Sequence, residues 1–254
     1  MTMNQVEKVK RFAKLHVKGS PLVLYNAWDA GSAKVIHEAG AKAVATSSWS
    51  VAAAHGYEDG EEMPLELVET IVARIAATVD VPVTADFEGG YSDNDTVLAK
   101  SISQLLHLGV IGINFEDRVV KGKGLYEIEK QALRIAAIRK AADKRDVALF
   151  INTRTDIFFE NGDNPESVMD EALERAKAYA AAGASGFFIP GLVNENLIQR
   201  ICKEVPLPVN VMVMEGVPSN ARLTKLGVSR ISYGPIPYLD AMESLRKKAK
   251  RIHA

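Results

Sequence analysis

Residues 81–117, VPVTADFEGGYSDNDTVLAKSISQLLHLGVIGINFED, contain a strand, a helix and a second strand in succession. The β-branched run at 83–86 predicts the first strand, the spacing of apolar residues over 95–107 predicts an amphipathic helix, and 112–116 predicts the second strand. Gly109 precedes the second strand, where the left-handed backbone that ends many helices is easiest for glycine. Strands joined through a helix pair in parallel, so this stretch predicts one unit of a parallel α/β sheet.

The same unit recurs along the chain of 254 residues. Eight such units favour a closed (β/α)₈ TIM barrel over an open doubly wound sheet, and a barrel of this kind usually has about 250 residues. No linker or change in composition divides the chain, so we expect a single barrel domain over residues 1–254. The predicted strands are 22–25, 43–46, 83–86, 112–116, 148–152, 186–189, 209–212 and 230–233. The predicted helices are 4–16, 30–39, 64–78, 95–107, 129–142, 166–182, 194–203, 219–226 and one from about 237.

Composition argues against several classes of partner. The chain has 31 basic and 32 acidic side chains, a net charge of -1, and no basic stripe that would neutralise nucleic-acid phosphates. No apolar run approaches the roughly 18 residues that span a membrane, and no signal-peptide pattern is present, so we expect a cytoplasmic protein. Cys202 is the only cysteine, which rules out an internal disulfide, and its apolar neighbours indicate a buried thiol.

Acidic residues follow two of the predicted strands, at the end where TIM-barrel active sites form. Asp86 and Glu88 lie two positions apart and share a face if the strand geometry continues, while Glu116 ends the next strand. Carboxylates this close repel one another unless a cation or protons intervene. Oxygen ligands without Cys or His suit Mg²⁺, with Mn²⁺ as an alternative, so we predict a metal site on these three acids. The alternative is that the acids cap helices or pair with nearby Lys and Arg side chains.

Two further strand ends carry candidate substrate contacts. Arg154 follows the fifth predicted strand, where a guanidinium can hold a carboxylate or phosphonate through two parallel hydrogen bonds. A salt bridge from Arg154 to Asp156 or Glu116 is the compatible alternative. Ser47 and Ser48 end the second strand, where their backbone N–H groups can donate to an oxyanion, although such a pair more often caps a helix.

Six segments together resemble the isocitrate lyase/phosphoenolpyruvate mutase superfamily. The resemblance is greatest to its phosphonomutase-like, or carboxyvinyl-carboxyphosphonate phosphorylmutase-like, branch and runs from about residue 25 to 233. The segments are YNAWD at 25–29, residues 47–59, DFEGGY at 86–91, NFED at 114–117, NTRTD at 152–156 and PVNV at 208–211.

The resemblance implies a Mg²⁺-dependent enzyme that cleaves or rearranges a C–C or P–C bond through an enolate. The substrate would be a small 2-oxo acid or a phosphonate. Asp86 would touch the metal directly, and Glu88 and Glu116 would hold it largely through water. Asp59 matches an acid near the metal shell that we take as catalytic.

The resemblance also implies substrate contacts, a lid and an assembly. Ser47 and Ser48 match the segment whose backbone binds the substrate oxyanion, and Arg154 matches the substrate-binding arginine. Trp49 and Asn210 are further candidate substrate contacts; Trp49 would replace the family's aromatic residue two positions before Ser47, where this chain has Ala45. Residues 118–126 match the lid, in which Lys121 is the candidate catalytic lysine. A homodimer or homotetramer with its last helix exchanged between subunits is implied as well.

This chain departs from the family pattern in the lid. The cysteine that serves as the acid in the family's C–C lyases is absent, and so is the Asn-Ser pair of the mutases. Glu88 is also longer than the Asp of those mutases. Cleavage of isocitrate by the usual mechanism is therefore not expected. The alternatives are an oxaloacetate-type decarboxylase, which needs only metal and oxyanion stabilisation, and a non-catalytic barrel that binds a small acid.

Overall fold

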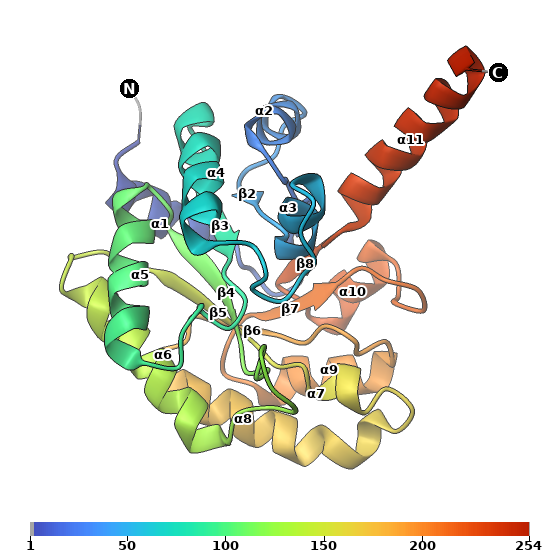
Figure 1. The fold of residues 1–254 in the computed structure, drawn as a ribbon. Coiled ribbons are helices and arrows are strands. Elements are labelled where there is room, and N and C mark those ends of the chain that lie inside the picture. Colours follow the sequence, from blue (N-terminus) through green and yellow to red (C-terminus); the bar gives the residue numbers. More distant parts are fainter. Residues whose placement is uncertain (1–2, 254) are drawn as a thin grey trace.

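Eight parallel strands form a nearly closed barrel in the computed structural model, which describes residues 3–253 (Figure 1). The strand order is β1-β8-β7-β6-β5-β4-β3-β2, and an isolated bridge between Ala27 and Thr46 joins the two ends. The predicted (β/α)₈ TIM barrel is therefore confirmed. The strands are β1 (Leu22–Leu24), β2 (Val44–Ala45), β3 (Val83–Asp86), β4 (Gly112–Glu116), β5 (Phe150–Arg154), β6 (Gly186–Phe188), β7 (Val209–Met212) and β8 (Arg230–Ser232).

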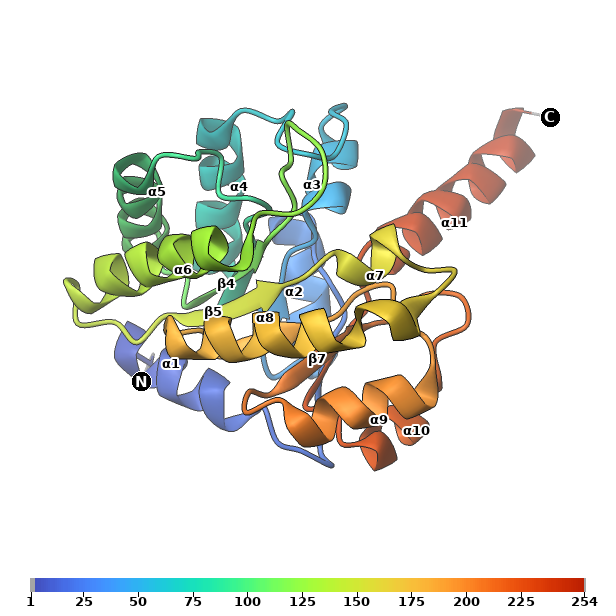
Figure 2. The ribbon, with the colours of Figure 1, turned by 90° about the horizontal axis from the view of Figure 1, so that it is seen from below.

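Helices surround the barrel, as Figures 1 and 2 show from two directions. Two short ones, α3 and α7, were not predicted, because a helix of one or two turns carries too little periodicity to be recognised. The helices are α1 (Gln5–Lys14), α2 (Ala30–Glu38), α3 (Ser48–Ala54), α4 (Leu65–Thr78), α5 (Asp95–His107), α6 (Ile128–Asp143), α7 (Ile157–Glu160), the 3₁₀ turn Pro165–Val168, α8 (Met169–Ala181), α9 (Glu195–Glu204), α10 (Asn220–Leu226) and α11 (Ile236–His253).

The fifth strand differs from its prediction. It covers Phe150–Arg154 rather than 148–152, because Phe150 pairs with Gly112 and the register continues until Arg154 pairs with Glu116. Arg154 thus belongs to the strand itself. A rigid strand holds its side chain, which aims the guanidinium at the top of the barrel more firmly than a loop would.

The barrel interior is polar in its middle layer. Asn114 accepts hydrogen bonds from Asn152 at 2.9 Å and from Arg230 at 3.1 Å, and Ser232 donates to Asn210 at 3.2 Å. Because β4 and β8 are not neighbours in the sheet, the bond between Arg230 and Asn114 crosses the interior. We call these five buried residues the polar floor, since the candidate site lies above them.

Helix α1 closes the opposite end of the barrel. Phe12 packs edge-on against Phe150, with ring centroids 5.1 Å apart, and His16 stacks on Phe150 at 4.2 Å. A Cβ atom on Gly112 would lie 3.3 Å from the Phe12 ring and 3.2 Å from the Phe150 carbonyl oxygen, so glycine leaves the room that α1 needs. Ligands therefore reach the interior from the other end, where the strands' carboxyl ends lie.

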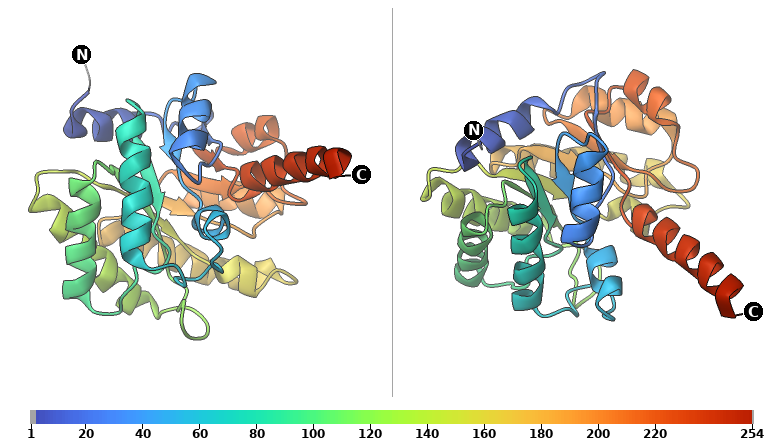
Figure 3. Two further views of the ribbon diagram at one scale, coloured as in Figure 1. Left: turned by 45° about the horizontal axis from the view of Figure 1, so that its top comes forward. Right: turned by 90° about the horizontal axis from the view of Figure 1, so that it is seen from above.

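Helix α11 extends away from the barrel in every view (Figure 3). Val23 on β1 is consequently 43% exposed, and Leu245 on α11 is 59% exposed. The outer side of β1 and one side of α11 thus both present apolar surface. In the part of the chain that the structure describes, no helix is long and apolar enough to cross a membrane.

Candidate active site at the carboxyl ends of the strands

A central cavity of about 200 Å³ opens above the polar floor. It is smaller than the roughly 300–1,000 Å³ of drug-sized ligand sites, so it suits a small molecule. The cavity brings together six of the predicted site residues: Ser47, Ser48, Trp49, Asp59, Asp86 and Arg154. The other residues that line it are Asn26, Asn114, Phe159, Phe188, Met212, Ser232, Gly234 and Pro235.

Helix α3 places the Ser-Ser pair beside Asp86. Ser47 is the N-cap of α3, and the N–H and hydroxyl of Ser48 both donate to Asp86 Oδ2, at 3.1 and 3.0 Å. The Ser47 N–H donates to the Ala27 carbonyl at 3.3 Å. The pair therefore caps a helix, and its amides are already used within the protein. The Ser47 hydroxyl accepts from the Ser50 N–H and hydroxyl, at 3.4 and 3.2 Å, so its own O–H is the one donor of the pair that remains for a ligand.

Asp86 has one carboxylate oxygen that is satisfied and one that is not. Oδ2 accepts the two bonds from Ser48, whereas Oδ1 is buried and has no hydrogen-bond partner among residues 3–253. A buried, unpartnered carboxylate oxygen is costly unless a cation or a bound molecule completes it. The donor set thus fits a hard cation that binds one protein oxygen directly and takes its other ligands from water or substrate.

Glu88 departs from the expected continuation of the strand. Strand β3 ends at Asp86, Phe87 enters the core, and Glu88 has a left-handed φ of 47°. Its carboxylate accepts from the N–H groups of Gly60 and Glu61 at 3.0 and 2.8 Å, and from the Tyr91 hydroxyl at 3.0 Å. Glu88 therefore fastens the loop at 60–61 to the loop after β3.

Glu116 and Arg154 form a buried ion pair. Arg154 Nη1 lies 3.0 Å from Glu116 Oε2, and its Nε and Nη2 donate to Asp156 at 2.5 and 2.8 Å. The predicted salt bridges of Arg154 are both confirmed. One N–H on each terminal nitrogen remains for a ligand, because a guanidinium has five N–H groups and three are used.

The acids around Asp86 share an electrostatic environment. Burial and the charges of Asp59 and Asp86 raise the pKa of Glu88 to about 7. Burial, opposed by Arg154, raises the pKa of Glu116 to about 8, and burial with the charge of Asp86 raises the pKa of Asp59. Within residues 3–253, no three acidic, His or Cys side chains converge closely enough to ligate one ion together. The arrangement is therefore one free Asp86 oxygen, with Asp59, Glu88 and Glu116 near enough to interact electrostatically but not to share one ion directly.

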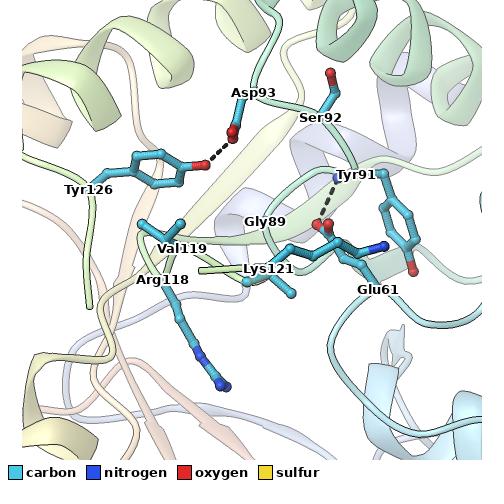
Figure 4. Close-up of a pocket in the computed structure, with 10 residues that line it drawn as sticks. Glu61, Gly89, Tyr91, Ser92, Asp93, Arg118, Val119, Lys121 and Tyr126 are labelled. Carbon is cyan, nitrogen blue, oxygen red and sulfur yellow. Dashed lines mark hydrogen bonds between the residues drawn. The ribbon is translucent and has the colours of Figure 1, made fainter. Parts of the chain in front are cut away.

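Lys121 lies outside the central cavity, on the lid loop at 118–126. This loop closes a second cavity of about 200 Å³, which Figure 4 shows together with Glu61 and Asp93. The Tyr126 hydroxyl donates to Asp93 at the base of the loop. Val120 rests on the loop after β3, since a Cβ atom on Gly89 would lie 2.7 Å from its side chain. Asn210 likewise does not line the central cavity and lies buried in the polar floor.

Sequence reasoning missed two buried arginines that support the site. Arg134 on α6 donates to the carbonyls of Gly89 and Ser92, at 2.5 and 3.1 Å, and stacks on Tyr126 at 4.4 Å. It thereby ties the loop after β3 to the lid. Arg230 lies in the polar floor. Its place in a short strand was a usable signal, since alternate strand residues point into a barrel.

Comparison with known proteins identifies the family of this chain. A 2,3-dimethylmalate lyase from Eubacterium barkeri is 32% identical over 84% of this chain and 74% of its own. An uncharacterized protein of Mycobacterium tuberculosis is 30% identical over 95% of this chain and 88% of its own. The crystal structure of a candidate phosphonomutase from Burkholderia cenocepacia J2315 shares 46% identity, with a TM-score of 0.94 over 98% of this chain and 99% of the other. The family model described as phosphoenolpyruvate phosphomutase matches residues 12–253, so this chain belongs to that family and to the isocitrate lyase/phosphoenolpyruvate mutase superfamily, whose members include lyases and mutases of small acids.

Proposed function

We propose that this protein is a Mg²⁺-dependent lyase or mutase that cleaves or rearranges a C–C or P–C bond of a small 2-oxo acid or phosphonate. The observation that carries the proposal is the unpartnered Oδ1 of Asp86, which borders a cavity that also holds Arg154. A cation at Oδ1 and an anionic substrate at Arg154 would lie side by side. Bond cleavage next to a carbonyl leaves an enolate, whose negative charge such a site stabilises.

Asp86 would hold the ion directly through Oδ1, with Glu88 and Glu116 holding it through water. When bound, Mg²⁺ (or Mn²⁺) would neutralise the acids and draw electron density from the substrate carbonyl. The proposed ion thus accounts for a group of acids whose pKa values are raised by burial and mutual repulsion.

The chain's own residues supply positioning and proton transfer. Arg154 would hold the carboxylate or phosphonate through its two remaining N–H groups, while the Ser47 side chain and Trp49 contact the rest of the substrate. Asp59 borders the cavity, and its raised pKa suits an acid that exchanges a proton with the substrate. Lys121 would bring a positive charge over the cavity when the lid loop closes. Asn210 would act on the substrate through Ser232, which donates to it and lines the cavity.

Oxaloacetate-type decarboxylation is the second candidate. Of the described residues that line the central cavity, none is a cysteine or a histidine. Decarboxylation releases CO₂, leaves the same enolate and needs only a metal and oxyanion stabilisation, so it does not depend on the family's lid residues that this chain lacks. A non-catalytic barrel that binds a small acid is the remaining alternative.

We further propose that the protein is a homodimer or homotetramer in which α11 packs against a second copy. Helix α11 leaves its own barrel, and Leu239, Leu245 and Val23 are exposed apolar side chains on α11 and β1. A helix from another subunit would cover them.

NMR-monitored turnover of a panel of 2-oxo acids, 2-hydroxy acids and phosphonates, with Mg²⁺ and with EDTA, tests the function. We expect metal-dependent loss of one compound, and its products separate P–C cleavage, C–C cleavage and decarboxylation. Asp86→Ala should abolish turnover, while Asp163→Ala, which changes an exposed acid away from the cavity, should not. Undiminished turnover by Asp86→Ala, or turnover that persists in EDTA, would contradict the proposal. Saturable binding without turnover of any compound would favour the non-catalytic alternative.

A further inference from the structure

Arg230 is a fully buried cation that forms no salt bridge among the described residues. Its guanidinium donates to Ser232 Oγ at 3.2 Å and to Asn114 Oδ1 at 3.1 Å, while Nη1 has no partner. Burial, opposed by the charge of Asp86, lowers the pKa of Arg230 to about 9, so the side chain is still cationic at neutral pH. A buried charge without a directly bonded counter-ion is costly, and apolar side chains would fill a barrel interior at less cost.

The guanidinium determines which way the Asn114 amide faces. Asn114 Oδ1 accepts from Arg230 Nη2 and from Asn152 Nδ2, which uses both lone pairs of the carbonyl oxygen. Rotating the amide by half a turn would place its NH₂ group against Arg230, which has donors only. Because arginine cannot accept a hydrogen bond, this rotation is excluded.

The free end of the amide therefore faces the central cavity. Asn114 lines that cavity, and its Nδ2 donates to no acceptor in residues 3–253. Asn114 also pairs in register with Asp86, so the two residues are neighbours on adjacent strands. The floor of the cavity thus presents an N–H donor of fixed direction next to the unpartnered carboxylate oxygen.

We infer that Asn114 is a substrate-binding residue whose Nδ2 donates to a carboxylate or carbonyl oxygen of the acid in the central cavity, and that Arg230 is the positioning residue that fixes this donor. The inference rests on the proposed function and assigns one more contact in the same site. An oxygen-rich anion placed beside Asp86 needs donors around it, and Asn114 supplies one from beneath. Arg230 adds a positive charge on the same side.

Binding of oxalate, a small dicarboxylate that resembles the enolate of a 2-oxo acid, tests the inference by calorimetry in the presence of Mg²⁺. Asn114→Ala removes the donor, and Asn114→Asp keeps the oxygen that Arg230 needs while replacing the donor with an acceptor. We expect both to bind oxalate roughly 10- to 100-fold more weakly, the usual effect of losing a hydrogen bond to a charged group. Asn161→Ala, which removes a side-chain bond to the Ile157 carbonyl away from the cavity, is the control and should bind normally.

Arg230 is tested through rescue. Arg230→Met keeps the volume but frees the Asn114 amide to rotate, so we expect oxalate binding to weaken by roughly 2- to 10-fold. Arg230→Lys retains a donor-only cation and should restore part of this loss, which a role in packing alone would not produce. Circular dichroism identifies any variant that fails to fold, and Asn114→Asp keeps the inference testable if Arg230→Met does not.

The outcomes separate the inference from the proposed function. If the wild type binds oxalate and both Asn114 variants bind it more weakly, the inference is supported. If the wild type binds oxalate and both Asn114 variants bind it equally well, the inference is overturned and the proposed function is not. Equal binding by Arg230→Met and the wild type overturns the positioning part. If the wild-type protein does not bind oxalate saturably with Mg²⁺, the proposed function fails and the inference fails with it.

Discussion

Acidification should destabilise this barrel through His16. Burial, reinforced by the charge of Arg230, lowers the pKa of His16 to about 3 from its ordinary value of 6.5. The ring stacks on Phe150, and its Nδ1 lies 2.8 Å from the Phe12 carbonyl. Protonation would therefore place a second positive charge beside Arg230 inside the barrel.

The sign and size of the effect follow from linkage. A folded-state pKa below the unfolded one stabilises the fold above about pH 6.5, and this contribution is lost as the pH falls toward 3. Between pH 7 and pH 5, the unfolded chain takes up this proton and the folded protein does not. At 1.36 kcal/mol per pKa unit, His16 alone should lower the free energy of unfolding by about 2 kcal/mol over that interval.

Urea unfolding of the wild type and of His16→Gln at pH 7 and pH 5 measures the contribution. Glutamine does not titrate, so the variant should lose about 2 kcal/mol less than the wild type on acidification. Comparing the two proteins cancels the contribution of the other titrating groups to the pH dependence of the free energy of unfolding, because the contributions of distant sites are additive. A difference between the two losses below about 0.5 kcal/mol, the usual limit of additivity, would refute the reasoning.

Three further outcomes are expected. Mg²⁺ at a hundred times its dissociation constant should raise the free energy of unfolding of the wild type by about 2.7 kcal/mol in a thermal-shift titration, and Asp86→Asn should remove this effect. Tyr126→Phe breaks the bond to Asp93 but keeps the ring on Arg134, so trypsin should cleave the lid loop at Lys121 faster. An unchanged rate would show that the bond from Tyr126 to Asp93 does not hold the loop in place. Leu98→Ala, at a fully buried position, should lower the free energy of unfolding by about 2–5 kcal/mol in urea titrations.

The sequence predicts the order of strands and helices because each unit buries an apolar face. One prediction fails at a polar strand end. Thr153 and Arg154 resemble a loop by composition, yet both belong to β5, and Arg154 lines the central cavity. Helices α3 and α7 span only seven and four residues, which is too short for a periodic pattern to predict them.

The sequence likewise predicts only part of the candidate site. The acids and Arg154 were identifiable because a TIM barrel gathers the residues at the carboxyl ends of its strands. Which oxygen is free was not identifiable, since this depends on the bonds from Ser48 to Asp86 and from the loop at 60–61 to Glu88. The bond between Arg230 and Asn114 joins residues 116 positions apart and follows no local pattern.

The two sides of the barrel strands serve different purposes: the outer side stabilises the fold, and the polar floor on the inner side serves the candidate site. Between the sheet and its helices, apolar residues such as Ile113, Ile151 and Ile231 provide the burial that stabilises the fold. Inside the barrel, a guanidinium and three amides occupy space that aliphatic side chains would fill at less cost. Two of these polar atoms, Arg230 Nη1 and Asn210 Nδ2, lack a protein partner among the described residues. An interior built this way contributes little to stability, so its physical justification lies in the donors and the positive charge that it directs toward the cavity above.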